Sequence, residues 1–309
     1  MTTLVVEARF SVVVGGFAIP SCSTVKTKDY LPARVFAIVF LCLCALYSSP
    51  AVTATELERV PDKLVVLTFD DSVASQYSVV RPLLKHFGFG ATFFITEGFD
   101  FATNKKDYMT WEQIAELHRD GFEIGNHTRD HMGISSANLG KLREQVEAIN
   151  ARCAAHGIPR PVSFGYPGNA ITLEALGPLA ELGFRLARRG GEPERPYKEG
   201  RGIAYEPGRD HPLLIPTAGD ARPAWTLDDF KRAVGQAREG RISVLQFHGV
   251  PDNAHPWVST PPALFEEYLK HLRDEGCRVI ALRDLARYVD PAIVPVNPMA
   301  IIEERKANK

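Results

Sequence analysis

Short apolar runs alternate with amphipathic stretches along the chain from about residue 60. Apolar runs of roughly four to eight residues between turn-forming residues are typical of buried strands, whereas apolar positions three and four apart are typical of helices. We therefore predict strands at 64–69, 91–96, 122–125, 162–166, 184–187, 242–247 and 278–281. Helices are predicted at 77–87, 111–119, 136–156, 173–182, 227–238, 262–275 and 282–288.

The alternation of strands and helices predicts an α/β fold built on a parallel sheet. The interval 190–224 is rich in Gly, Pro and charge, and we expect an extended loop there with short strands at 203–205 and 213–215. No Gly-x-Gly-x-x-Gly sequence follows a strand, which argues against a dinucleotide-binding open sheet. The repeating part has about 255 residues, a size common for one barrel of β-α units, so we expect a closed or nearly closed barrel.

The first 54 residues have the pattern of a secretory leader. Thirteen apolar residues at 35–47 follow Lys26, Lys28 and Arg34, and small residues at 51–54 suit a signal peptidase. The apolar run is short for a membrane span, so we expect export to the periplasm, cell envelope or exterior, with an uncleaved membrane anchor as the alternative. The segment before the run is long for a signal peptide, which leaves a downstream start codon open. The expected division is a leader at 1–54, a folded catalytic domain at 55–290 and a loose tail at 291–309.

Charge and cysteine content narrow the expected partners. The net charge is −1, which gives no electrostatic basis for a nucleic-acid partner. No stable membrane partner is expected beyond anchoring by the leader. Cys153 and Cys277 are the cysteines that follow the leader, and they lack metal-ligand spacing. Either a disulfide formed outside the cytosol or two free thiols fits them.

Polar residues suited to metal and acid-base chemistry follow three of the predicted strands. Asp70 and Asp71 end the first strand, His127 and His131 follow the third, and His248 follows the sixth. Because the carboxyl ends of parallel strands converge on one mouth, we expect these side chains to lie together. Two imidazoles and a carboxylate suit a divalent ion with positions left for water, and the remaining carboxylate and imidazole suit a base and an acid. The pattern predicts a mononuclear metal hydrolase.

Each motif has a plainer interpretation when it is taken alone. His127 and His131 would point to one side if the chain became helical after the strand, but a bare His-x-x-x-His is more often a pair of surface histidines. The Asp70-Asp71 pair alone fits a solvated turn, and His248 alone fits a buried, hydrogen-bonded histidine. Their coincidence at three strand ends favours a site.

The three motifs together resemble those of the polysaccharide deacetylases, carbohydrate esterase family four, whose domain is shared with nodulation chitooligosaccharide deacetylases. They read Thr68-Phe69-Asp70-Asp71, His127-Thr128-Arg129-Asp130-His131 and Leu245-Gln246-Phe247-His248, in the order of that family. The resemblance covers about residues 63–285. It implies a distorted (β/α) barrel of about seven parallel strands in a single domain. It also implies removal of acetyl groups from N-acetylated sugars of a polysaccharide or oligosaccharide, or in some members from xylan.

The resemblance also implies roles for individual residues. Asp71, His127 and His131 correspond to the metal ligands, Asp70 to the general base and His248 to the general acid. The implied cofactor is one divalent ion, zinc in the first place, with Co²⁺ or another divalent ion as alternatives. The implied partner is an acetylated glycan.

One position departs from the family pattern. The third motif of the family carries Arg-x-Pro-aromatic after its strand, and Gly165 stands where the Arg is expected. Because that Arg holds the catalytic Asp in place, we expect a substitute. Arg188 and Arg189 close the next predicted strand and would face the same mouth. The Asp-containing motif before the last His is not clearly matched, and Asp210 and Asp220 are candidates for it.

Three aromatic residues are candidates for contact with a sugar, and two functions other than deacetylation stay open. Tyr166, Tyr205 and Trp257 are candidates for stacking on a sugar ring, although loop aromatics are about as often packing residues. One alternative function is an amide hydrolase of the same fold acting on a non-sugar C–N bond, such as that of a ureide or a formamide; the secretory leader argues against it. The other is a catalytically silent secreted carbohydrate-binding protein, which would need neither a base nor an acid.

Overall fold

The computed structural model describes residues 56–307. The predicted signal peptide and the alternative membrane anchor lie outside these residues. Within the described part, no helix combines the length and the apolar character needed to cross a membrane.

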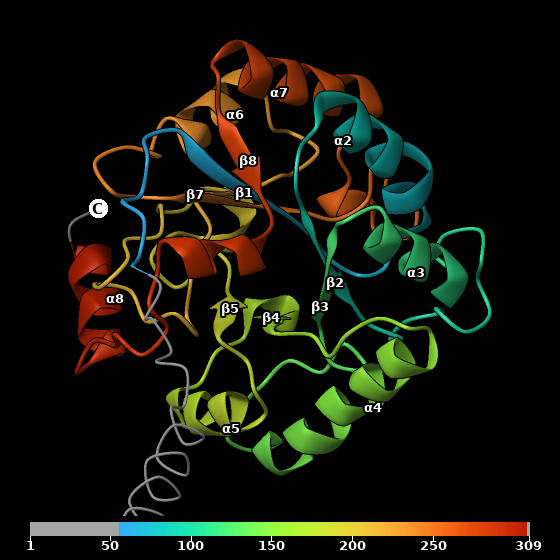
Figure 1. The fold of residues 1–309 in the computed structure, drawn as a ribbon, viewed down its shortest axis with the longest axis horizontal. Helices are drawn as coiled ribbons and strands as arrows, with labels where there is room; N and C mark the ends of the chain where they lie inside the picture. Colours follow the sequence, from blue (N-terminus) through green and yellow to red (C-terminus); the bar gives the residue numbers. More distant parts are fainter. Residues whose placement is uncertain (1–55, 308–309) are drawn as a thin grey trace, which may run out of the picture. The chain divides into compact units, whose positions relative to one another are not determined.

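Eight strands of the described chain form one sheet, and every strand pair in it is parallel (Figure 1). They are β1 (Leu64–Phe69), β2 (Thr92–Ile95), β3 (Glu123–Asn126), β4 (Ser163–Gly165), β5 (Leu186–Arg188), β6 (Gly219–Asp220), β7 (Ser243–Phe247) and β8 (Arg278–Ile280). The order is β5-β4-β3-β2-β1-β7-β6, and β8 pairs with β1. The seven strands predicted outside the 190–224 interval are confirmed, and β6 is an addition.

The sheet forms a distorted barrel because its two ends do not join as a regular ladder. β1 pairs with β8 through its first half and with β2 through its second half. Between β5 and β6 the connection consists of isolated bridges, Arg188 with Ile215 and Arg201 with Gly219. The short strands expected at 203–205 and 213–215 are therefore single bridges, since residues 190–218 cross the gap as an irregular segment.

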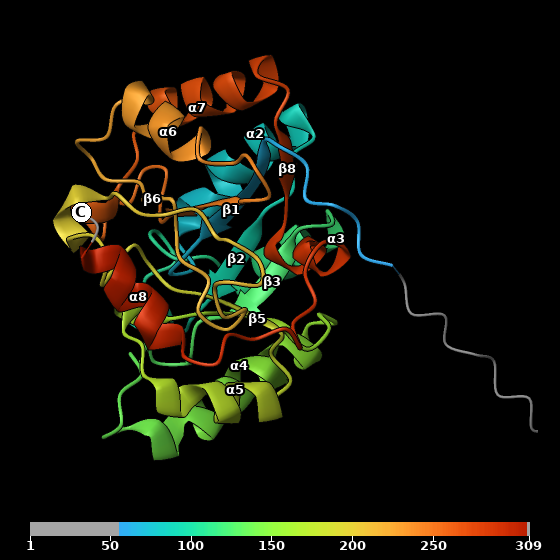
Figure 2. The same cartoon turned by 90° about the vertical axis from the view of Figure 1, so that its left-hand side faces the viewer.

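Helices cover the outside of the sheet (Figures 1 and 2). They are α2 (Arg81–Phe87), α3 (Trp111–Arg119), α4 (Leu142–Ala155), α5 (Leu176–Glu181), α6 (Leu227–Val234), α7 (Pro262–Asp274) and α8 (Pro298–Ala307). Short helical turns lie at Gln76–Val80, Leu139–Lys141, Pro167–Asn169, Leu173–Ala175, Tyr197–Glu199, Pro256–Val258 and Leu282–Arg287. A capping box begins α3 at Thr110, whose hydroxyl accepts from Gln113 N while the Gln113 side chain accepts from Thr110 N.

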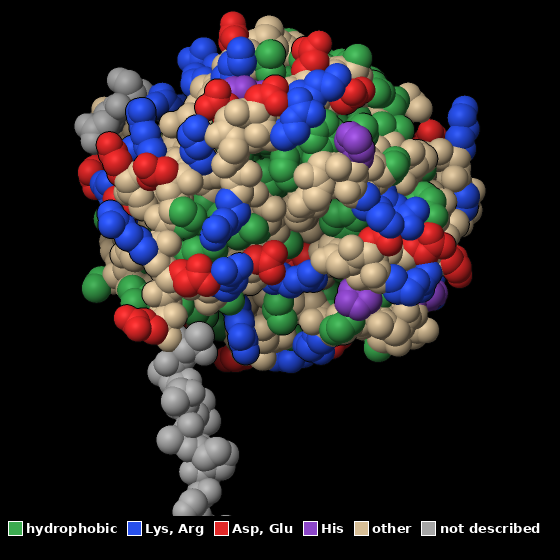
Figure 3. All heavy atoms as spheres, turned by 45° about the horizontal axis from the view of Figure 1, so that its top comes forward, with side chains coloured by type: hydrophobic (Ala, Val, Ile, Leu, Met, Phe, Trp, Pro, Cys, Tyr) green, Lys and Arg blue, Asp and Glu red, His purple; other side chains and the backbone are tan. Residues whose placement is uncertain are grey.

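The outer surface of these helices carries both signs of charge. Figure 3 shows Lys and Arg interspersed with Asp and Glu on the face that includes α6 and α7. Exposed pairs such as Arg232–Asp229 and Lys270–Glu266 contribute at most about 1 kcal/mol each. The helices are therefore held mainly by their apolar faces.

The strand β1 runs through the middle of the core. Its six residues are all buried. Val65, Leu67 and Phe69 pack into the large cluster under α2, α3 and α7, whereas Leu64 and Val66 pack into a second cluster on the other side. A strand buried on both faces is fixed in position, so the two carboxylates that follow it start from a rigid base.

The prediction of a loose C-terminal tail is wrong for residues 298–307, which form α8. Ile302 is buried, and Arg305 makes a 2.5 Å ion pair with Asp210. Both cysteines of the described part are free thiols, so the disulfide alternative does not hold for Cys153 and Cys277.

Candidate active site

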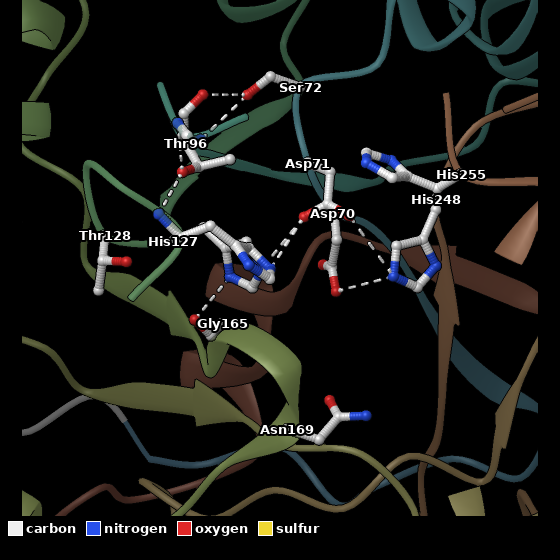
Figure 4. Close-up of polar contacts among 12 residues, drawn as sticks. Asp70, Asp71, Ser72, Thr96, His127, Thr128, Gly165, Asn169, His248 and His255 are labelled. Carbon is white, nitrogen blue, oxygen red and sulfur yellow. Dashed lines mark hydrogen bonds and ion pairs between the residues drawn. The ribbon is translucent and has the colours of Figure 1, made fainter. Parts of the chain in front are cut away.

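The carboxyl ends of β1, β3 and β7 converge on one cavity of about 160 Å³ (Figure 4). Its lining includes the two carboxylates and the three histidines that the sequence motifs singled out: Asp70, Asp71, His127, His131 and His248. In Figure 4 His127 lies on one side of the carboxylates and His248 on the other. Residues up to 178 positions apart in the chain are thus brought together by the parallel topology.

Three of these residues form a potential metal site. The ligand atoms offered by Asp71, His127 and His131 all lie within 4.8 Å of one another. Asp71 Oδ1 lies 3.4 Å from His127 Nε2 and 3.3 Å from His131 Nε2. The same oxygen is buried and accepts no hydrogen bond from the described residues. A buried orphan oxygen between two imidazole nitrogens fits a divalent ion, because such an ion would satisfy all three atoms.

The histidines are oriented by backbone and hydroxyl groups. His127 Nδ1 lies 2.7 Å from the carbonyl oxygen of Gly165, so it donates there and leaves Nε2 free to ligate. The backbone N–H of His131 donates to Thr96 Oγ1 over 3.0 Å. The chain does not become helical directly after β3, and a turn with left-handed residues at Thr128 and His131 brings the two rings to the same side.

The electrostatics of Asp71 match a ligand role. Burial by itself favours its neutral form, but the imidazoles of His127 and His131 close to Oδ1, with the nearby charge of His248, outweigh burial and hold the pKa of Asp71 well below its usual range. The carboxylate is therefore ionised at neutral pH.

Asp70 points into the same cavity and is held by two side chains. Its Oδ1 forms a buried ion pair with Arg188 Nη2, and its Oδ2 accepts from Gln246 Nε2 at 3.1 Å. Arg188 is fully buried, and its guanidinium lies over the Phe94 ring at 5.1 Å from the centroid. Between the two arginines that the sequence left open, the geometry therefore selects Arg188.

Gly165 explains how Arg188 reaches Asp70. Gly165 on β4 is the register partner of Arg188 on β5. A Cβ at Gly165 would lie 3.0 Å from Arg188 Nη2 and 2.8 Å from the Phe94 ring, closer than side chains tolerate. The absent side chain thus leaves the space through which the neighbouring strand delivers its guanidinium.

His248 closes the other side of the cavity. Its Nε2 lies 3.9 Å from Asp70 Oδ2 and 3.8 Å from Asp71 Oδ2. Its Nδ1 is buried without a hydrogen-bond partner among the described residues, as is Oδ1 of Asp220. Burial raises the pKa of Asp220, while the charges of Arg222 and His248 oppose that shift. Both candidates for the Asp-containing motif have an arginine partner, since Asp220 pairs with Arg222 and Asp210 pairs with Arg305.

Left-handed backbone conformations cluster around the cavity. Six of the eight left-handed non-glycine residues in the described chain lie on its loops: Asp71, Ser72, Phe99, Thr128, His131 and Asn169. Left-handed backbone is uncommon outside glycine, although Asp, Asn and His adopt it more readily than other residues, and it is concentrated in turns and at functional sites. At Asp71 and Ser72 the turn explains how two consecutive carboxylates reach one mouth instead of opposite faces of β1.

Comparison with known proteins agrees with this geometry. Residues 58–187 match the family model for polysaccharide deacetylase. This part of the chain belongs to the polysaccharide deacetylase family. The match includes β1 to β4 with both aspartates and the His pair, while Arg188 and His248 lie beyond it.

Two curated relatives share part of the sequence. The chain is 32% identical over 134 residues to YxkH of Bacillus subtilis (strain 168), whose name assigns it provisionally to the polysaccharide deacetylases, covering 43% of this chain and 46% of that protein. It is 26% identical over 125 residues to a peptidoglycan-N-acetylglucosamine deacetylase of Bacillus cereus, covering 40% and 55%. The alignments thus span about half the length of these relatives.

The fold is shared over a longer stretch. A family 4 acetyl xylan esterase from Clostridium thermocellum, solved with a cobalt ion, superposes with a TM-score of 0.51 at 22% identity. The superposition covers 77% of this chain and 96% of that one. The likeness supports the deacetylase barrel as the fold of the described part, β5 to β8 included.

Three of the residues predicted for the site lie elsewhere. Arg189 is buried on the opposite face of β5 and forms a bidentate pair with Glu194 at 2.5 and 2.8 Å. Tyr166 is buried and donates its hydroxyl to the Leu213 carbonyl, and Tyr205 is fully buried outside the cavity lining. These two rings cannot stack on a ligand, since no ring face reaches the cavity. Trp257 does line the cavity and is 61% exposed.

Several residues at the site escaped the sequence analysis. Gln76 is buried and donates to the carbonyls of both Asp70 and His248, which ties two strand ends together. Phe99 and His255 stand at the rim, with ring centroids 4.6 Å apart. Gln76 directly precedes a predicted amphipathic helix, and that position could have drawn attention to it. The rim residues come from loops whose course the sequence does not predict.

Proposed function

We propose that the protein is a metal-dependent hydrolase that removes acetyl groups from N-acetylated sugars of a polysaccharide or oligosaccharide. The observation that carries the proposal is the coincidence, in one cavity, of an Asp-His-His ligand set, an arginine-held carboxylate and a third histidine. Family membership of residues 58–187 supports the same reaction class.

The donor set suits zinc, with cobalt as the alternative. Held by Asp71, His127 and His131, the ion would polarise the acetyl carbonyl and the attacking water. The ligand set has three protein donors, which leaves coordination positions for these groups, as in catalytic rather than structural sites.

Asp70 and His248, on either side of the metal ligands, would transfer the protons. Asp70 is ion-paired with Arg188 and hydrogen-bonded to Gln246, so its carboxylate is fixed in the cavity to take a proton from the water as it attacks. His248, on the opposite side, is placed to give a proton to the departing nitrogen. The new C–O bond and the broken C–N bond yield acetate and a free amino sugar.

The exposed aromatic rim is suited to hold the sugar. Trp257 and Phe99 are 61% and 49% exposed at the cavity, and His255 lies between them with its ring 5.3 Å from Trp257 and 4.6 Å from Phe99. Flat faces of aromatic rings stack on the apolar face of a sugar, which would leave the acetyl group directed to the ligand set. We also propose export of the protein by its leader.

The test is acetate release together with metal analysis. Purified protein is incubated with N-acetylglucosamine oligomers, acetylated xylan, a ureide and a formamide, and released acid or amine is measured. We expect acetate from an N-acetylated oligomer and about one divalent ion per chain. Hydrolysis of the ureide or formamide alone would favour the non-sugar amide hydrolase, and binding of glycans without hydrolysis by metal-loaded protein would favour a silent carbohydrate-binding protein.

A further inference from the structure

The catalytic cavity is small for a polymeric substrate. Its volume of about 160 Å³ is well below the roughly 300–1,000 Å³ of pockets that enclose a drug-sized ligand. It has room for the acetyl group and part of one sugar. Further sugars of a chain must therefore lie outside it, on a neighbouring surface.

A second depression of about 700 Å³ adjoins the cavity, and Asn169 lines both. We name it the α8 groove. Asn169, Leu173 and Pro193 line it from the barrel, and Met299, Glu303 and Lys306 line it from α8. The mixture of apolar and hydrogen-bonding groups suits a sugar, which presents C–H groups on its faces and hydroxyls on its edges.

The wall made by α8 is fixed in place. Met299, Glu303 and Lys306 are spaced four and three residues apart, so they share one face of the helix. Ile302, three residues from Met299 and four from Lys306, lies next to this face and is buried, and Arg305 pairs with Asp210 at 2.5 Å. A salt bridge of Glu304 with Arg209 at 2.8 Å adds a further tie. These contacts hold α8 in a defined position on the barrel, so the groove has a fixed shape.

Asn169 connects the groove to the catalytic residues. It is 7% exposed, has a left-handed backbone, and its Oδ1 accepts from Arg188 Nη1 at 3.3 Å. Arg188 in turn holds Asp70. Figure 4 shows the Asn169 side chain beside the ligand set, below the carboxylates. A sugar that lies over Asn169 therefore adjoins the position where the acetyl group reacts.

We propose that the α8 groove binds the stretch of glycan next to the sugar being deacetylated, so that the preferred substrate is an oligosaccharide of several units. The inference rests on the proposed function. On this proposal α8 determines how strongly activity depends on the length of the glycan. Loss of its groove-lining face would leave the chemistry intact and remove only contacts to the more distant sugars.

The test fills the groove and follows the dependence on chain length. Met299→Trp places a bulky ring in the groove, and Ala300→Trp, at an exposed position of α8 that does not line it, is the matched control. Glu303→Trp repeats the test at an exposed groove position, should Met299 be needed for packing. kcat/KM for acetate release is measured on N-acetylglucosamine oligomers of two to six units, with denaturant unfolding as the check of folding.

For the wild type we expect kcat/KM to rise roughly tenfold from the dimer to the longer oligomers, because contacts to the more distant sugars add binding energy in the transition state. Met299→Trp and Glu303→Trp should abolish that rise while leaving dimer kinetics unchanged, and Ala300→Trp should behave as wild type. Equal length dependence in the groove variants, or a flat wild-type profile, would overturn this inference and leave the proposed function standing. No acetate from any oligomer would overturn the proposed function, and this inference with it.

Discussion

Replacing Arg188 by methionine tests the relation between the buried guanidinium and the base. Arg188 is fully buried and Asp70 is 2% exposed, so the variant leaves a buried carboxylate without its cation. Breaking a buried pair in this way typically destabilises a protein by about 3–5 kcal/mol. Because Gln246 still donates to Oδ2 of Asp70, we expect the lower end, about 3 kcal/mol.

Arg188→Met should also lower kcat, because the guanidinium fixes the position of the Asp70 carboxylate. Without the guanidinium, one oxygen of Asp70 is free to rotate, and a displacement of about 1 Å of a catalytic group costs on the order of 10²-fold in rate. Arg188 contacts none of the three ligand residues by hydrogen bond, so metal content should be unchanged. Steady-state kinetics give the change in kcat, metal analysis gives the ion bound per chain, and urea unfolding gives the change in stability.

Arg189→Met is the matched control. Arg189 is equally buried, follows Arg188 directly after the end of β5 and is ion-paired, but its partner is Glu194. It should lose comparable stability and keep wild-type kcat. The reasoning fails if Arg188→Met turns over normally, or if both variants lose kcat to the same degree, because the loss would then come from general destabilisation.

Three further predictions concern the ligand set, the base and the rim. His127→Ala should lose tight binding of the divalent ion, and a full equivalent retained after dialysis would contradict its ligand role. Asp70→Asn should keep the ion but lose about 10²–10⁴ in kcat; loss of the ion instead would mean that Asp70 is a ligand. The Asp252 carboxylate, whose Oδ2 lies 3.6 Å from His255 Nδ1, raises the pKa of His255 above the unfolded value of about 6.5, even though burial opposes this shift. The stability contributed by the pair is therefore full below pH 6.5 and is lost as pH rises through the folded pKa. The difference in unfolding free energy between wild type and His255→Gln should be larger at pH 5.5 than at pH 9, and a difference independent of pH would refute it.

Seven of the strands, and the residues that meet at their carboxyl ends, could be predicted from the sequence alone. Continuous apolar runs can only be satisfied by burial, and polar residues directly after them lie at the open ends of parallel strands. Asp70, Asp71, His127 and His248 could therefore be assigned to one mouth before any coordinates, since the topology leaves them no other common location. Even the missing arginine at Gly165 indicated that a neighbouring strand had to supply a cation.

The tertiary structure alone decided between Arg188 and Arg189. Consecutive residues of a strand point to opposite faces, so only one can enter the cavity, and the register of β4 with β5 sets which one it is. The same holds for Tyr166, whose ring turns into the core, and for α8, which looked like a loose tail. Its anchor joins Arg305 to Asp210, 95 residues apart. A contact of that separation leaves no periodic mark in the sequence, because it depends on where two distant segments meet after the barrel has formed.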